Sequence, residues 1–330
     1  MPAPMILAGD IGGTKTILAL FERDGPFAPA VEETFPSQKH KTFDEIVDVF
    51  LARHKPKIAL ACVGVAGPVK DGRCEATNLP WVVDASELAR ELGIARAWLL
   101  NDLEAYAYGI AALRPEDLAV LNEGAHDAQG NRCVVAAGTG LGEAGIFWDG
   151  TGWRPFASEG GHTDFAPTNE LEIELLRYLL QRHERVSWER LVSGMGLVNI
   201  YRFLKETGRE EEPAWLAEAM RAEDPGAVIG RHARDGRSPL CAKALDVFLE
   251  LYGAETGDAA LKMMATGGVY VGGGIAPKNL ERLKEGPFLR RFLAKGRMRA
   301  LMESMPVRVI LNEKTGLLGA AQGAFLRASR

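Results

Sequence analysis

Two glycine-rich segments of the sequence could bind phosphate groups. They are Asp10-Ile11-Gly12-Gly13-Thr14 and Gly138-Thr139-Gly140-Leu141-Gly142. Glycines let several backbone N–H groups converge on one anion, because no side chain stands in the way. In the first segment the Asp10 carboxylate could hold a magnesium ion, and the Thr14 hydroxyl could donate to a phosphate oxygen. Each segment taken alone could equally be an ordinary turn.

A third glycine cluster, Gly272-Gly273-Gly274, follows an apolar run that we expect to form a strand. Such a backbone suits close packing of a flat adenine or a ribose. A tight turn between a strand and a helix would explain the same residues equally well.

Asn101 and Asp102 follow the strand that we expect at residues 97–100. The carboxyl ends of strands are the usual place for catalytic groups in α/β folds. A hydroxyl that attacks a phosphoryl group does not ionise at neutral pH, so a carboxylate commonly accepts its proton as the new bond forms. Asp102 is the candidate base, and capping of the following helix is its alternative role.

Polar side chains gather in the segment SEGGHTD at residues 158–164. Carboxylates and imidazoles hold hydroxyl-rich ligands through hydrogen bonds in fixed directions, so Glu159 and His162 could bind a sugar. A metal site would need more converging ligands than these two residues supply. An ordinary polar loop is the other alternative.

The elements around these segments follow from the apolar pattern. Strands are expected at residues 5–9 and 16–21, so the first glycine loop joins two strands. A dinucleotide-binding loop or a P-loop would instead be followed by a helix, which argues against both. Helices are expected after Thr42, with Glu45 completing a capping box, and after Asp84, and a further strand is expected at residues 58–66.

The strand–glycine loop–strand pattern occurs a second time. We expect strands at residues 133–137 and 143–148, on either side of the second glycine loop. Two such repeats would place their glycine loops on opposite sides of one cleft. Residues 169–264 are expected to be mostly helical, followed by strands at 269–272 and 307–311 and a final Ala-rich helix.

The composition limits the possible partners and the compartment. The 330 residues are 47% hydrophobic and 25% charged, with a formal net charge of -5, which favours no binding to nucleic acid or to an anionic membrane surface. The sequence predicts no signal peptide and no membrane span, so a cytoplasmic location is expected. The four cysteines are scattered and are expected to be reduced thiols. They are Cys62, Cys74, Cys133 and Cys241.

Taken together and in order, these segments resemble the bacterial glucokinases of the actin-like sugar kinase group. The resemblance extends over almost the whole chain. It rests on LAGDIGGTKT at 7–16, LLNDLEAYAYG at 99–109, AAGTGLGEAGIF at 136–147, SEGGHTDFAP at 158–167, SWERLVSGMGLVNIY at 187–201, GGVYVGGGIAPK at 267–278 and NEKTGLLGAA at 312–321.

The resemblance implies an α/β protein with the two-domain actin-like (ribonuclease H-like) ATPase fold and an interdomain cleft. A smaller α/β domain would comprise residues 1–111 plus 312–330, and a larger domain with helical insertions would comprise residues 112–311. The domains would close over ATP and glucose, and the protein would be a homodimer.

The resemblance also implies a glucokinase, which transfers the γ-phosphate of ATP, bound with Mg²⁺, to the 6-hydroxyl of glucose in the first step of glycolysis. The sugar contacts would be Asn78, Asn101, Asp102, Glu159, His162 and Glu189, with Asp102 as the base. The nucleotide contacts would be Gly9, Asp10, Gly12, Gly13, Thr14, Gly138, Thr139, Gly140, Gly142, Gly272, Gly273 and Gly274.

Three alternatives stay open at this point. The substrate could be fructose, mannose or an N-acetylhexosamine, because the segment DIGGTKT at 10–16 resembles the related broad-specificity sugar kinase and repressor family. A zinc ion is not expected, since residues 163–186 lack the cysteines of that family. A sugar-sensing regulator would need a DNA-binding segment before the first strand, and an actin- or chaperone-like ATPase would have no use for the Glu159–His162 cluster.

Overall fold

The computed structural model describes residues 4–22 and 28–328. The chain divides into two compact units. Unit 1 comprises Met1–Asp117, Pro155–Ala157 and Asn312–Arg330, and unit 2 comprises Leu118–Arg154 and Ser158–Leu311. The domain limits that the sequence suggests, at 111/112 and 311/312, stay a prediction.

Unit 1 contains a five-stranded sheet in the order β3-β2-β1-β4-β7. Strand β1 runs antiparallel to β2 and parallel to β4, and β4 runs parallel to β7. The strands are β1 (Met5–Ile11), β2 (Lys15–Glu22), β3 (Pro29–Pro36), β4 (Ile58–Val65) and β7 (Ala97–Asn101), and a separate ribbon joins β5 (Arg73–Glu75) to β6 (Val82–Asp84).

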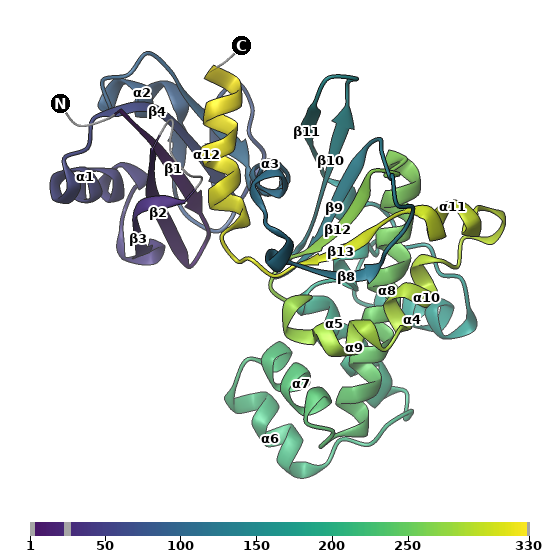
Figure 1. The fold of residues 1–330 in the computed structure, drawn as a ribbon. Coiled ribbons are helices and arrows are strands. Elements are labelled where there is room, and N and C mark those ends of the chain that lie inside the picture. Colours follow the sequence, from purple (N-terminus) through teal and green to yellow (C-terminus); the bar gives the residue numbers. More distant parts are fainter. Residues whose placement is uncertain (1–3, 23–27, 329–330) are drawn as a thin grey trace. The chain divides into compact units, whose positions relative to one another are not determined.

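Helices cover both faces of this sheet, because β1 is apolar on both sides. Leu7 and Ile11 belong to the core with α1 (Phe43–His54) and α2 (Ala85–Glu91). Ile6 and Ala8 belong to the core with α3 (Asp102–Gly109) and α12 (Thr315–Ala328). Figure 1 shows α12, the last helix of the chain, beside α3. The predicted caps are confirmed, since Thr42 accepts from the Glu45 N–H and Asp84 from the Glu87 N–H.

Unit 2 contains a six-stranded sheet in the order β11-β10-β9-β12-β13-β8. Its first five positions repeat the order of unit 1, with β9 antiparallel to β10 and parallel to β12 as β1 is to β2 and β4. The predicted internal repeat is therefore confirmed. The strands are β8 (Leu118–Asn122), β9 (Arg132–Ala137), β10 (Leu141–Trp148), β11 (Trp153–Ser158), β12 (Gly268–Gly272) and β13 (Val307–Ile310).

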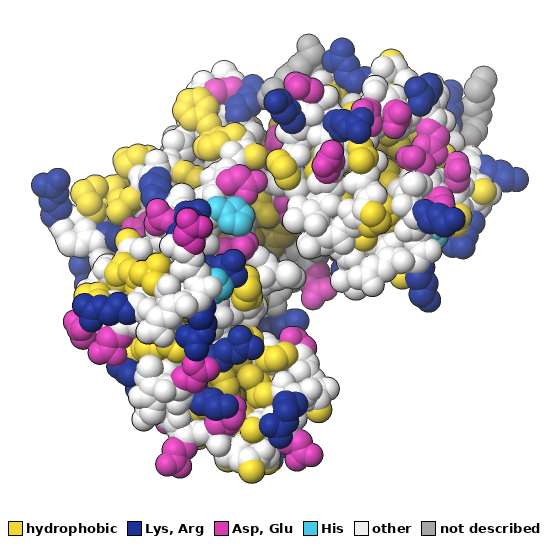
Figure 2. Space-filling view, turned by 180° about the vertical axis from the view of Figure 1, so that it is seen from behind, with side chains coloured by type: hydrophobic (Ala, Val, Ile, Leu, Met, Phe, Trp, Pro, Cys, Tyr) yellow, Lys and Arg dark blue, Asp and Glu magenta, His cyan; other side chains and the backbone are white. Residues whose placement is uncertain are grey.

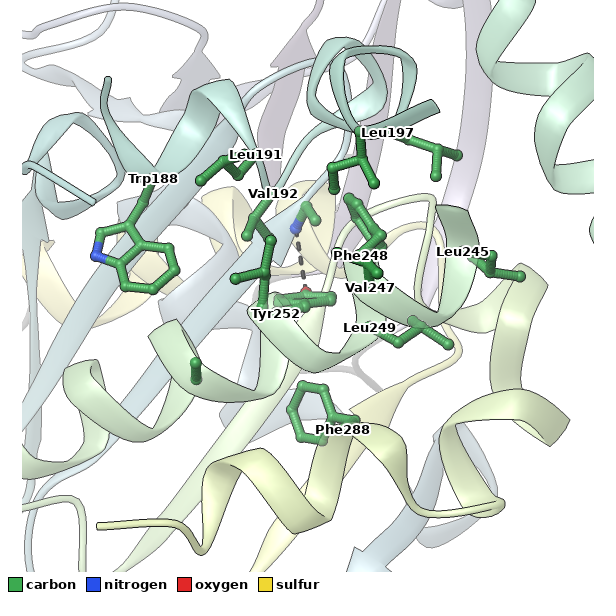
Figure 3. Packing of buried hydrophobic residues seen from close by; sticks show 14 of the residues in the cluster. Trp188, Leu191, Val192, Leu197, Leu245, Val247, Phe248, Leu249, Tyr252 and Phe288 are labelled. Atoms are coloured by element: carbon green, nitrogen blue, oxygen red, sulfur yellow. Dashed lines mark hydrogen bonds between the residues drawn. The ribbon is translucent and has the colours of Figure 1, made fainter. Parts of the chain in front are cut away.

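Helices pack on one face of the unit 2 sheet around a single large core. Cys133, Val135 and Val271 supply the sheet side of this core, and Tyr252 and Phe288 supply part of the helical side. Figure 3 shows the close packing of buried side chains in this core. The helices are α4 (Glu170–Leu180), α5 (Gly194–Glu206), α6 (Ala214–Ala222), α7 (Pro225–Arg234), α8 (Pro239–Met263), α9 (Leu280–Lys284), α10 (Pro287–Phe292) and α11 (Arg299–Ser304).

The described residues also contain short 3₁₀ helices. They are η1 (Ser37–Lys39), η2 (Ile110–Ala112), η3 (Pro115–Asp117), η4 (Gly160–His162), η5 (Trp188–Arg190), η6 (Pro277–Asn279) and η7 (Gly296–Met298). Strand β10 begins at Leu141, two residues before the predicted start, because Leu141 and Gly142, the last two residues of the glycine segment, already pair with β9.

The surface carries charges of both signs. Figure 2 shows Lys and Arg side chains interspersed with Asp and Glu side chains over the visible face of each unit. All four cysteines are buried and unpaired. Within residues 4–22 and 28–328, no helix combines the length and the apolar character that crossing a membrane requires.

Candidate active site

The first glycine loop is a tight connection between β1 and β2, held from outside by Ser37. The Gly12 N–H donates to the Lys15 carbonyl at 3.0 Å, and the Ser37 hydroxyl donates to the Gly12 carbonyl at 2.8 Å. The Ser37 N–H donates to the Thr14 carbonyl at 3.0 Å. The loop is thus fixed by its backbone, while the Thr14 side chain is exposed and able to contact a ligand.

Asp10 is the penultimate residue of β1, on the face that α12 covers. A Cβ atom added to Gly316, in the first turn of α12, would lie 3.3 Å from its Oδ2 atom. Burial raises the pKa of Asp10 to about 6, although the charge of Lys15 opposes this rise. A helix N-terminus and a divalent cation both favour a carboxylate in its charged form, so this position fits the predicted magnesium contact.

Asn78 contacts this loop, whereas Gly9 lies inside the sheet. A Cβ atom added to Gly13 would lie 2.8 Å from the Cβ of Asn78, so the Asn78 side chain packs directly on the loop. Gly9 is buried inside the sheet, where an added Cβ would meet Val63 and Leu18 at 3.0 and 3.1 Å. Close packing of strands explains Gly9 without a ligand.

Asn101, and not Asp102, caps helix α3. The Asn101 Oδ1 atom accepts from the Leu103 and Glu104 N–H groups at 3.0 and 3.3 Å, and its Nδ2 atom donates to the Gly67 carbonyl at 3.1 Å. Asp102 is the first residue of the helix, and its Oδ1 atom also accepts from the Leu103 N–H at 2.9 Å. The alternative role of Asp102 as the helix cap is therefore wrong.

The second glycine loop is joined to Glu189. The Glu189 Oε2 atom accepts from the Leu141 N–H at 3.0 Å, and a Cβ atom added to Gly140 would lie 2.4 Å from the same oxygen. Only glycine at position 140 lets the carboxylate approach the loop backbone. A Cβ atom added to Gly138 would meet nothing within 4 Å, so its side of the loop is open.

His162 lies between two carboxylates. Its Nδ1 atom is 3.9 Å from Glu189 Oε1, and its Nε2 atom is 3.9 Å from Glu159 Oε2. These separations are longer than hydrogen bonds, so the three side chains can direct donors and acceptors at a ligand. Arg185 holds the loop backbone by donating to the His162 carbonyl at 2.7 Å.

The third glycine cluster approaches the second loop. Gly273 has a φ of +77°, and an added Cβ would lie 2.2 Å from the Ala137 carbonyl oxygen. Both the positive φ and the neighbouring backbone require glycine at this position. The alternative explanation of this cluster, a tight turn, therefore accounts for Gly273. A Cβ added to Gly274 would meet nothing within 4 Å.

A buried pair of carboxyl groups lies behind the sugar-binding candidates. Glu143 on β10 is 2% exposed and Glu255 on α8 is 0% exposed. A Cβ added to Gly160 would lie 2.0 Å from Glu143 Oε2, so this pair supports the loop that carries Glu159 and His162. Burial, and then the adjacent Glu143 carboxyl, raises the pKa of Glu255 to about 10, and burial also raises the pKa of Glu143.

Because of this buried pair, we expect the free energy of unfolding to fall as the pH rises. The folded protein keeps the Glu255 proton at pH values where the unfolded chain has lost it, so the free energy of unfolding falls from about pH 5 upward. Glu255→Gln keeps a neutral side chain at every pH. We expect its melting temperature to equal that of the wild type near pH 5 and to exceed it by about 3 °C or more at pH 9.

The matched control for this measurement is Glu250→Gln, on the same helix and partly exposed beside Arg290. It should leave the pH dependence of the melting temperature unchanged. Parallel curves for wild type and Glu255→Gln from pH 5 to pH 9 would contradict the assignment of this dependence to the buried pair.

Each unit thus gathers its own set of candidates. Unit 1 joins Asp10, Gly12, Gly13 and Thr14 with Asn78, and places Asn101 beside Asp102. Unit 2 joins the second and third glycine clusters with Glu159, His162 and Glu189. Ser37, Glu143 and Glu255 were not among the residues predicted from the sequence. Of these only Glu143 carried a signal, since it is a charged residue inside an apolar strand.

Two repeated sheets, in which glycine loops join β1 to β2 and β9 to β10, together with similarity to solved structures, place the protein in the class of sugar kinases with the actin-like ATPase fold. The glucokinase from an Antarctic psychrotroph has a TM-score of 0.83 at 31% identity, covering 97% of this chain and 98% of its own. A ROK family glucokinase from Streptomyces griseus, solved with glucose and AMPPNP, shares the fold at a TM-score of 0.65 and 22% identity, covering 97% and 99% of the two chains.

Sequence comparison identifies the family. The glucokinase family model matches residues 7–326. The glucokinase of a Nostoc species is 43% identical over 337 residues, covering 96% of this chain and 98% of its own. The chain belongs to the glucokinase family, and the predictions of this family, of the actin-like fold and of an ATP-dependent hexose kinase are confirmed.

Proposed function

We propose that this kinase phosphorylates the 6-hydroxyl of glucose with ATP, and that Asp102 is the base of the reaction. The observation that carries the proposal is the position of Glu189. One of its oxygens accepts from the backbone of the second glycine loop, and the other lies 3.9 Å from His162. A single carboxylate therefore connects the loop proposed for the phosphates with the side chains proposed for the sugar.

The transfer needs little covalent chemistry from the protein. The sugar oxygen attacks the γ-phosphorus, the bond to the β-phosphate oxygen breaks, and ADP leaves with the electron pair. Asp102 accepts the hydroxyl proton as the new bond forms. Asn101 keeps Asp102 in place by capping α3 and by donating to the Gly67 carbonyl.

The remaining candidates bind and orient the substrates. The carboxylates of Glu159 and Glu189, the His162 ring and the amides of Asn78 and Asn101 would hold the sugar hydroxyls in fixed directions. The glycine loops would contact the phosphates through backbone N–H groups. Magnesium bound with ATP would neutralise phosphate charge, and Asp10 is the residue that would hold it.

Two further expectations from the sequence belong to the proposal. The enzyme would act in the cytoplasm at the first step of glycolysis, and it would be a homodimer. Light scattering coupled to size-exclusion chromatography measures the mass directly, and a particle of one chain would overturn the homodimer.

The test of the function is ATP consumption against a panel of hexoses. Glucose should give the highest kcat/KM, with fructose, mannose and N-acetylglucosamine at least about tenfold lower, because one misplaced hydroxyl leaves a buried partner unpaired. A preference for another hexose would replace glucose as the substrate. ATP turnover that no sugar stimulates would instead favour a sugar-sensing regulator or a mechanical ATPase.

A further inference from the structure

The hydroxyl of Tyr252 links the two strands of unit 2 that lead into the second and third glycine clusters. It accepts from the Ala137 N–H at 3.1 Å and lies 3.0 Å from the carbonyl oxygens of Val135 and Gly272, to which it can donate. Val135 and Ala137 are near the end of β9, and Gly272 is the last residue of β12. Gly138 and Gly273 follow immediately.

The position of this hydroxyl is where the two parallel strands stop pairing. Ala136 and Gly272 form the last pair of the β9–β12 ladder. Beyond it the chain turns, with Gly273 at a φ of +77° and the Ile275 N–H donating to the Ala137 carbonyl at 3.3 Å. The Tyr252 hydroxyl therefore takes the place of the next rung of the ladder, at the point where the two loops leave the sheet.

The ring of Tyr252 is itself firmly held. The residue is 0% exposed, and its ring meets Phe288 of α10 edge to face, with centroids 5.5 Å apart. Figure 3 shows Tyr252 among the buried side chains of α8, with its hydroxyl hydrogen-bonded and Phe288 beside its ring. The hydroxyl of this buried ring therefore contacts both strand ends at one point.

We infer that Tyr252 is a positioning residue for ATP binding: its hydroxyl sets the spacing between the second and third glycine clusters. This inference rests on the proposed function, in which both clusters contact the nucleotide. Tyr252 does not touch the substrate in this account. It acts through the backbone of Ala137 and Gly272.

The test is Tyr252→Phe, which keeps the ring and removes only the hydroxyl. Loops that contact ATP equally in the ground state and the transition state change KM and leave kcat nearly unchanged when they are displaced. We expect KM for ATP to rise about tenfold, since a buried amide and its carbonyl neighbours lose their partner. The values of kcat and of KM for glucose should stay within about twofold of the wild type.

The control is Tyr201→Phe, in the same unit. Tyr201 is 2% exposed and its hydroxyl donates to Glu212 Oε1 at 2.7 Å, so the variant also loses one tyrosine hydrogen bond, which is partly buried. It should lower the melting temperature and leave both KM values unchanged. AMPPNP binding measured by calorimetry should weaken in Tyr252→Phe and not in Tyr201→Phe.

Two results would overturn the inference while leaving the proposed function intact. One is an active Tyr252→Phe enzyme whose KM for ATP equals that of the control. The other is a loss of kcat with no change in KM for ATP. A wild-type protein without glucose-dependent ATP turnover would overturn the proposed function instead, so the two failures are distinguishable.

Discussion

Asp102→Asn should lower kcat for glucose phosphorylation by about 10²–10⁴-fold, the usual contribution of a general base. Asparagine keeps the size of the side chain and its first oxygen, which accepts from the Leu103 N–H at 2.9 Å. The helix keeps its cap, since Asn101 supplies it. The fold and the KM values should therefore change little. Steady-state kinetics measure the loss of catalysis, and a thermal unfolding curve shows whether the variant is still folded.

The control for this variant is Asp127→Asn, an exposed carboxylate in the connection between β8 and β9 of unit 2. It should retain wild-type kcat and KM. An Asp102→Asn enzyme that folds normally and turns over within about threefold of the wild type would contradict the role of Asp102 as the base.

Gly319→Ala should destabilise the protein by about 3 kcal/mol or more. Gly319 is in the middle of α12, where an added Cβ would lie 1.6 Å from the Ala105 carbonyl oxygen of α3. Alanine is the better helix former, by about 1 kcal/mol, so any loss must come from the contact between the helices. Since α3 begins at Asp102, displacement of α3 should also lower kcat.

Gly226→Ala is the matched control, because it makes the same change in helix α7, where the nearest atom to the new Cβ would be 3.6 Å away. Its free energy of unfolding should stay within about 1 kcal/mol of the wild type or rise. Urea denaturation measures both variants. Equal stability of Gly319→Ala and Gly226→Ala would show that α3 and α12 can separate without cost.

The sequence predicts the repeated sheets because their signals are local. Each strand–glycine loop–strand pattern lies within one short segment, Met5–Glu22 or Arg132–Trp148, and apolar runs with glycine between them need no distant partner. The same local reasoning found the caps of α1 and α2. It missed strands β3, β8 and β11, whose burial is incomplete, and β11 also contains Pro155, which argues against a strand.

The site could be predicted only in part, since several of its contacts join residues far apart in the chain. Glu189 reaches Leu141 across 48 residues, and Tyr252 reaches Ala137 across 115. No spacing rule connects such pairs, so Glu189 was found through family resemblance alone. For the same reason Ser37 and Glu255 were not predicted, since their contacts are also with residues far away in the chain. Asn101 and Asp102 were found because they follow a strand directly.

The packing of α12 has a consequence for the order in which the chain folds during synthesis. The face of the first sheet that carries Ile6 and Ala8 is completed only by residues of the final 14-residue helix. A ribosome adds about 5–20 residues per second, so the segment from Leu118 to Lys314 takes roughly 10–40 s to make. Through that time the nascent chain carries an unfinished apolar surface on the part synthesised first. The apolar core on this face of the N-terminal unit therefore cannot be completed until α12 has been synthesised.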